Sequence, residues 1–134
     1  MCRKRRRGAA AVEFAFVAPV FFLLVLGMIE FGRMVMVQQV ITNGSREGAR
    51  VAVLDGTTGA EVQAAVEGYL SSANVPGASI TVDPTEPSTA GYGAPVTVTV
   101  SVPFSQVSWL PTPMLIGGDT ELTATTVMRR ETVQ

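Results

Sequence analysis

The sequence predicts an α+β protein, in which a long N-terminal transmembrane helix continues into a small domain with a second amphipathic helix and a three-stranded antiparallel sheet. Three observations predict this class. An apolar stretch lies near the start, a segment with helical period follows position 57, and three later segments alternate apolar and polar residues. With 134 residues, the chain has room for one modest domain besides the apolar stretch.

The apolar stretch, residues 8–29, reads "GAAAVEFAFVAPVFFLLVLGMI" and is interrupted only by Glu13 and Pro19. A helix of about 22 residues is about 33 Å long, enough to cross a hydrocarbon core of about 30 Å. Five basic residues at positions 3–7 precede it. Because Lys and Arg accumulate on the cytoplasmic side, we expect the N-terminus inside the cell and everything after Arg33 outside.

The helix is expected to continue beyond the membrane, from about Ala9 to Leu54. The sequence "EFGRMVMVQQVITNGSREGARVAVL" contains no proline and keeps apolar residues at helical spacing. Its glycines, together with Gly27, each weaken a helix by up to about 1 kcal/mol, so we expect close packing against a neighbour to compensate. The alternative is that Gly44 ends the helix.

A second helix is predicted for "TTGAEVQAAVEGYLSS", which runs from about Thr58 to Ser71. Thr58 stands three residues before Glu61, the spacing of a capping box, in which each side chain accepts a hydrogen bond from a free backbone amide of the other residue. The apolar residues that follow fall on one face, which we expect to lie against the rest of the domain. They are Val62, Ala65, Val66, Tyr69 and Leu70.

After this helix the period changes to two, which predicts three strands with one apolar face each. The segments are "ASITVD", "APVTVTVSVPF" and "TELTATTVMRR". A long loop between the second and third strands carries the only tryptophan, Trp109, with Leu110, Met114, Leu115 and Ile116. These residues either fold back as a lid on the sheet edge or form a contact surface for a partner.

The composition excludes several functional classes. The chain has no histidine and one cysteine, Cys2, so His-based zinc sites, Ser-His-Asp hydrolysis and Cys-His catalysis are not expected. No paired acids stand at a spacing useful for carboxylate catalysis. Beyond the basic block, five basic residues face eleven acids, a formal charge of −6, which disfavours nucleic-acid binding. We therefore expect no enzyme activity, no catalytic residues, no metal and no cofactor.

The N-terminal region resembles a known family. "RRRGAAAVEFAFVAPVFFLLVLGMIEFGR" followed by "QQVITNGSREGAR" is similar to the start of TadE-like proteins, the minor pilins or pseudopilins of the tight-adherence (Tad, or Flp) branch of type IV pilus systems. The resemblance covers roughly residues 5–54 and rests on a combination: a basic leader, Gly8, small residues, "VEF", a proline in the apolar run, "EFGR" and "REGAR". From Thr57 onward only the helix-plus-sheet outline is compatible.

The resemblance implies a pilin-like processing and assembly pathway. It implies that an aspartic prepilin peptidase cleaves between Gly8 and Ala9, and that Glu13 and Phe14 serve assembly and register. The chain then divides into a leader (residues 1–8), the transmembrane part of the helix (9–32) and a pilin-like domain outside the cytoplasm that includes the distal half of the helix (33–134).

The expected setting also follows from the resemblance. The protein would pass once through the bacterial inner membrane and act in assembly of a Tad pilus for adherence or secretion. Its partners would be the prepilin peptidase, other Tad pilins and inner-membrane platform proteins.

The position of Glu13 in the apolar run also has a physical explanation that does not depend on the resemblance. A lone carboxylate in hydrocarbon is costly, so it should neutralise or find a cation. When helices stack with a small axial offset, the amine freed at Ala9 of one subunit can reach the Glu13 carboxylate of its neighbour. Such a buried pair is strongly sensitive to loss of either partner, which makes it a register device.

Other charged residues and glycines on the same helix are candidate packing or assembly contacts. Glu30 and Arg33 form either a surface ion pair or a membrane-exit anchor or assembly contact. Arg46, Glu47 and Arg50 form either a solvated face or a contact.

Gly44 and Gly48 are four residues apart and would line a stripe that another helix or the sheet can approach. The alternative function is an uncleaved, single-span, membrane-anchored binding module, which predicts a conspicuous pocket in the domain.

Overall fold

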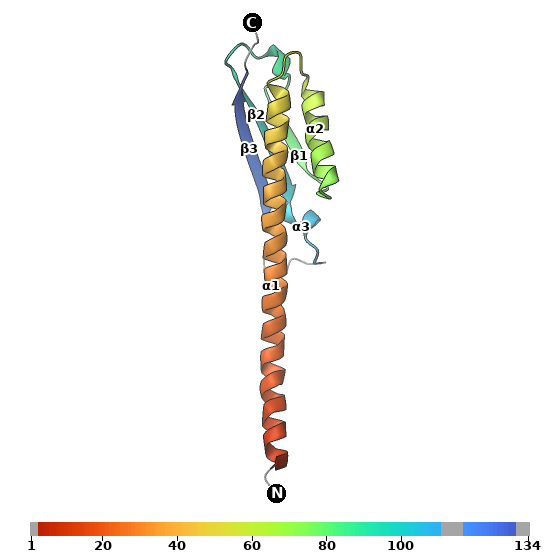
Figure 1. The fold of residues 1–134 in the computed structure, drawn as a ribbon, viewed down its shortest axis with the longest axis vertical. Helices are drawn as coiled ribbons and strands as arrows, with labels where there is room; N and C mark the ends of the chain where they lie inside the picture. Colours follow the sequence, from red (N-terminus) through yellow and green to blue (C-terminus); the bar gives the residue numbers. More distant parts are fainter. Residues whose placement is uncertain (1–2, 111–116, 131–134) are drawn as a thin grey trace.

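A single helix, α1 (Arg3–Ala52), forms the axis of the molecule (Figure 1). The computed structural model describes residues 3–110 and 117–130, with side chains from residue 8 onward. The helix runs without a break through Pro19 and Gly44. The predicted long helix is therefore confirmed, although it begins at Arg3 rather than near Ala9 and ends at Ala52 rather than Leu54. The alternative that Gly44 ends it is wrong. The N-terminal half projects from the domain, and the C-terminal half packs on it.

The second helix, α2 (Gly59–Ser72), begins with the predicted capping box. The Thr58 side chain accepts from the Glu61 amide, and the Glu61 carboxylate accepts from the Thr58 amide at 2.9 Å. Val62, Val66 and Leu70 are buried. These three residues of the predicted amphipathic face pack inward, whereas Ala65 is half-buried and Tyr69 is exposed at the rim of the helix contact. The main contacts of α2 are with α1 and the first strand.

The sheet has the predicted three antiparallel strands in the order β1-β2-β3. They are β1 (Ser79–Asp83), β2 (Pro95–Pro103) and β3 (Glu121–Arg129). Two short elements lie in the connections, the 3-10 helix η1 (Pro87–Thr89) and the four-residue helix α3 (Phe104–Val107). The α+β class is confirmed.

The core lies between one face of the sheet and the two long helices. The four inward valines of β2 are fully buried, as the alternation predicted: Val96, Val98, Val100 and Val102. They meet Val37 and Ile41 of α1, which are also fully buried. The opposite face of the sheet is rich in Thr and Ser, and the Thr99 and Thr125 hydroxyls lie 3.1 Å apart across it.

The domain has two distinct ends along the axis of α1. The C-terminus of α2, α3 and the start of β3 lie at the end nearest the projecting half of α1 (Figure 1). The α1–α2 loop, the β1–β2 connection and the end of β3 lie at the far end. We call these the proximal and distal ends. Phe104 and Val107 of α3 are buried and close the proximal end of the core.

Arg130 joins three segments at the distal end. Its Nη1 donates to the carbonyls of Pro87, Ser88 and Ala90 at 2.7–3.2 Å, and its Nη2 donates to the Asp55 carboxylate at 2.8 Å. The arginine is 7% exposed, whereas the Asp55 side chain is 73% exposed. Water screens the ion pair, so the carbonyl bonds dominate the stabilisation.

Arg130→Met is expected to destabilise the fold by about 2–4 kcal/mol, because it removes the charge-assisted hydrogen bonds that join the end of β3 to the β1–β2 connection and to Asp55. Arg129→Met is the matched control, since Arg129 is exposed and should change stability by less than about 0.5 kcal/mol. Thermal unfolding of the full chain in detergent measures both. Equal midpoints for the two variants would contradict the role of Arg130.

Candidate assembly and membrane-boundary site

The projecting half of α1 exposes a large apolar surface. Its side chains include Phe14, Phe16 and Val20, which are 65–76% exposed. Among the described residues, this helix is long and apolar enough to cross a membrane, and none of its apolar window is buried within the chain. An exposed apolar surface of this size needs lipid or another apolar partner. The chain is thus consistent with a single-pass membrane-anchored protein.

Glu13 lies on this projecting half, with Gly8, Ala9 and Phe14 on the same helical stretch, and all four residues are exposed. From Ala9 to Glu13 the helix rises four residues, about 6 Å. No other described acid lies in the apolar run. Because the Glu13 side chain is exposed among the described residues, its carboxylate is accessible to an intermolecular contact, and its expected role in assembly stays a prediction.

Glu30 and Arg33 lie where α1 enters the domain, and both are buried, at 2% and 8% exposure. The surface ion-pair interpretation is wrong. Arg33 Nε donates to the Val107 carbonyl at 2.9 Å and its Nη2 to the Asn74 carbonyl at 3.4 Å. Neither Glu30 oxygen has a hydrogen-bond partner in the described structure. Burial removes both side chains from the free surface that a neighbouring subunit can touch.

Trp109 lies beside Arg33 at the point where α1 enters the domain. Its ring centroid lies 5.1 Å from Arg33 Cζ, within the range of a cation–π contact. The side chain is nevertheless 69% exposed. A lid folded over the sheet edge would bury the ring, so Trp109 itself does not form such a lid. Leu110, the next residue of the predicted lid, is half-buried, and Met114, Leu115 and Ile116 lie outside the described residues.

Gly44 and Gly48 face α2, as a close-packed glycine stripe requires. A Cβ at Gly44 would lie 3.4 Å from Leu70 Cδ2. A Cβ at Gly48 would overlap Val66 Cγ2 and lie 3.2 Å from Val98 Cγ1. The stripe is therefore occupied inside the domain by α2 and β2, and it serves packing within the subunit.

Gly48→Ala is expected to destabilise the fold by about 1–2 kcal/mol. Overpacking costs about 1–3 kcal/mol, and the higher helix propensity of alanine offsets up to about 1 kcal/mol of this. Gly68→Ala in α2 is the control, because a Cβ there meets nothing within 4 Å, and it should stabilise the fold slightly. Opposite shifts of the thermal midpoint are expected. A stabilising Gly48→Ala would show that the packing is looser than described.

The charged cluster near the end of α1 remains on the surface. Arg46 and Arg50 are exposed, and Arg50 Nη1 lies 3.9 Å from the Glu47 carboxylate. With side chains 76% and 45% exposed, this pair contributes little to stability. The structure leaves both arginines available to a neighbouring molecule.

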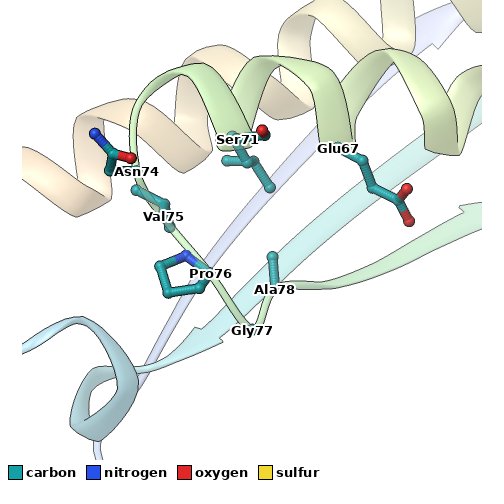
Figure 2. A pocket seen from close by; sticks show the side chains of 8 residues that line it. Glu67, Ser71, Asn74, Val75, Pro76, Gly77 and Ala78 are labelled. Carbon is teal, nitrogen blue, oxygen red and sulfur yellow. The ribbon is translucent and has the colours of Figure 1, made fainter.

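The domain has an open groove of about 550 Å³ between the end of α2 and the start of β1 (Figure 2). Glu67, Ser71 and Asn74 are the polar side chains that line it, together with Leu70 and the residues from Val75 to Ala78. The lining contains one ionisable group and no aromatic ring. The lining combines apolar side chains with a few polar groups, and the binding-module alternative, which predicts a pocket in the domain, stays an untested prediction.

Sequence reasoning missed how Glu30 and Arg33 become buried. Arg33 bonds to a carbonyl 74 positions away, in a four-residue helix that the sequence analysis did not predict. The "PFSQVSW" segment carried a partial signal, since Phe104 and Val107 have helical spacing directly after a strand. Among the described residues, no group of His, Cys, Asp and Glu lies close enough to hold a metal ion.

Comparison with known proteins gives a family match for the N-terminal region. Residues 8–50 match the family model described as TadE-like protein. No curated protein and no solved structure matched the chain. The matched segment contains Gly8, Ala9, Glu13, the whole apolar run and the glycine stripe, and it ends at Arg50. The resemblance of the N-terminal region to the TadE-like family is thereby confirmed over residues 8–50.

Proposed function

We propose that the chain is a minor pilin, or pseudopilin, of a Tad-type pilus, made as a membrane-anchored precursor and used in assembly of the filament. The observation that carries the proposal is the family match over residues 8–50, which contains Glu13 and the whole apolar run of α1. The exposed apolar half of α1 supports it. This surface fits lipid before assembly and the apolar helices of neighbouring subunits afterwards.

Processing by a prepilin peptidase is the first step. Hydrolysis of the Gly8–Ala9 peptide bond on the cytoplasmic face removes the basic segment and leaves a free amine at Ala9. The basic residues at positions 3–7 would otherwise hold the start of α1 at the cytoplasmic surface, because moving them into hydrocarbon is costly. Their removal permits the helix to leave the membrane.

Assembly then pairs the new amine with Glu13. Ala9 and Glu13 are separated by about 6 Å along the helix axis, so a neighbour displaced by about that distance places its amine beside the carboxylate. Both charges leave water when helices pack, and each is stable there only with the other. The pair therefore favours one axial offset between subunits.

The domain would lie outside the cytoplasm and present its surface to other pilus subunits. The exposed guanidinium groups of Arg46 and Arg50 are candidates for such contacts. Glu30, Arg33, Gly44 and Gly48 serve the interior of the subunit instead. Adherence or secretion would follow from the assembled pilus.

Deletion and crosslinking in the native cell test this function. A strain lacking the chain should lose surface pili and regain them when the wild-type chain is restored. A photoreactive residue at position 16, where Phe16 is 76% exposed, should crosslink to other pilins and platform proteins. The same variant in a strain without those proteins is the control. Normal piliation without the chain, together with no crosslink to pilus proteins, would reject the proposal.

A further inference from the structure

Trp109 occupies a defined position relative to the apolar run of α1. The run ends at Ile29, and Arg33 follows four residues, about 6 Å, later. The headgroup layer on each side of a bilayer is about 5–8 Å thick, so Arg33 falls within it when the run fills the hydrocarbon core. The centroid of the Trp109 ring is 5.1 Å from the Arg33 guanidinium carbon, so the two differ in depth by no more than this distance.

We propose that Trp109 inserts into the headgroup layer of the bilayer that α1 crosses and docks the proximal end of the domain on the membrane before assembly. An indole has an apolar body and one N–H donor, which suits the boundary between hydrocarbon and water. The ring is 69% exposed, although it lies beside the buried Arg33 and its residue follows α3 by two positions. Lipid at this depth covers the ring without any protein partner.

Arg33 is the positioning residue for this contact. Its hydrogen bonds to the Val107 and Asn74 carbonyls tie α1 to α3 and to the end of α2. The segment that carries Trp109 follows α3 directly and is held beside the membrane exit of α1. The inference rests on the membrane-anchored state in the proposed function, and it adds a second contact between the chain and the bilayer.

The charge around this end favours insertion of the ring over electrostatic attraction to anionic lipid. Asp119 and Glu121 are exposed at the start of β3, close to α3, and the positive charge of Arg33 is largely buried. These acids would repel an anionic surface. Docking is therefore expected to depend weakly on salt and on the fraction of anionic lipid.

The single tryptophan makes the test direct. The full chain is reconstituted in vesicles, and Trp109 emission is compared in lipids brominated near the headgroup end or near the methyl end of the acyl chain. We expect a blue-shifted emission and a larger loss of intensity with the shallow bromines. The control is Tyr92→Trp combined with Trp109→Phe, which moves the tryptophan to the distal end, where Tyr92 is 79% exposed. This variant should show water-exposed emission and no quenching.

Arg33→Gln provides a second variant, because it removes the ties to α3 and should weaken the depth-dependent quenching of Trp109. Vesicle flotation distinguishes failure of Trp109 docking from failure of membrane anchoring. A chain that floats with vesicles but gives no quenching of Trp109, or a blue-shifted emission that bromine does not quench, overturns the docking proposal and points to contact with another protein. A chain that does not float overturns membrane anchoring as well.

Discussion

Gly8→Leu is expected to abolish removal of the N-terminal segment, so that the chain accumulates as the precursor. A peptidase that cuts at the boundary between the basic segment and the apolar helix must accommodate the residue before the scissile bond. Glycine has no side chain that could clash with the enzyme there, whereas leucine has a bulky one. Cys2 gives a simple readout, because it is the only cysteine and lies in the segment that the proposed cleavage would remove. A thiol-reactive polymer should shift the mobility of the Gly8→Leu chain and leave the wild-type chain unshifted.

Gly32→Leu is the matched control for this experiment. Gly32 also lies in α1, and a Cβ there meets nothing within 4 Å, as at Gly8. The control should be processed like the wild type, and its polymer shift should be absent. If both leucine variants keep Cys2, the defect arises from membrane insertion rather than from the cleavage site. If Gly8→Leu loses Cys2 normally, Gly8 is not the recognised position.

Glu13→Gln is expected to be processed normally and to fail in assembly, with surface pili falling to the level of the deletion strain. The scissile bond is more than a helical turn from Glu13, so the peptidase should act on the variant. Glutamine keeps the shape and removes the charge, and the buried amine of a neighbour then lacks its counter-ion. The Cys2 assay reports processing, and electron microscopy with quantified surface pilin reports assembly.

Two further variants sharpen the Glu13 experiment. Glu13→Asp retains the charge on a shorter side chain and should restore part of the piliation. Glu67→Gln removes an exposed charge on α2 and should leave piliation unchanged. Normal piliation with Gln at position 13 would leave Glu13 without a role and favour a plain membrane anchor. Loss of processing in Glu13→Gln would assign the carboxylate to the peptidase instead.

The elements with local causes could be predicted from the sequence. The capping box depends on residues three positions apart, and the strand faces depend on a period of two, so both were visible without tertiary information. The long helix was also predictable, since no proline interrupts its second half. Its continuity through Gly44 and Gly48 has a tertiary cause, because Leu70 and Val66 approach the space that a side chain would fill.

The buried charges could not be predicted, because their partners are far away in the chain. Glu30 and Arg33 are three residues apart, which indicates a surface pair in an isolated helix. In the fold, Val107 and Asn74 supply carbonyls to Arg33 instead. Arg130 likewise gains its acceptors from a loop about forty positions earlier, and a local pattern cannot reveal such a contact.

The N-terminus of the membrane-extracted wild-type chain tests the pilin account most directly. N-terminal sequencing, supported by intact mass, should give Ala9 as the first residue, because only removal before the apolar run leaves the apolar half of α1 intact and creates the amine that pairs with Glu13. A chain that still begins at Met1, or one that begins beyond residue 25, would contradict the account.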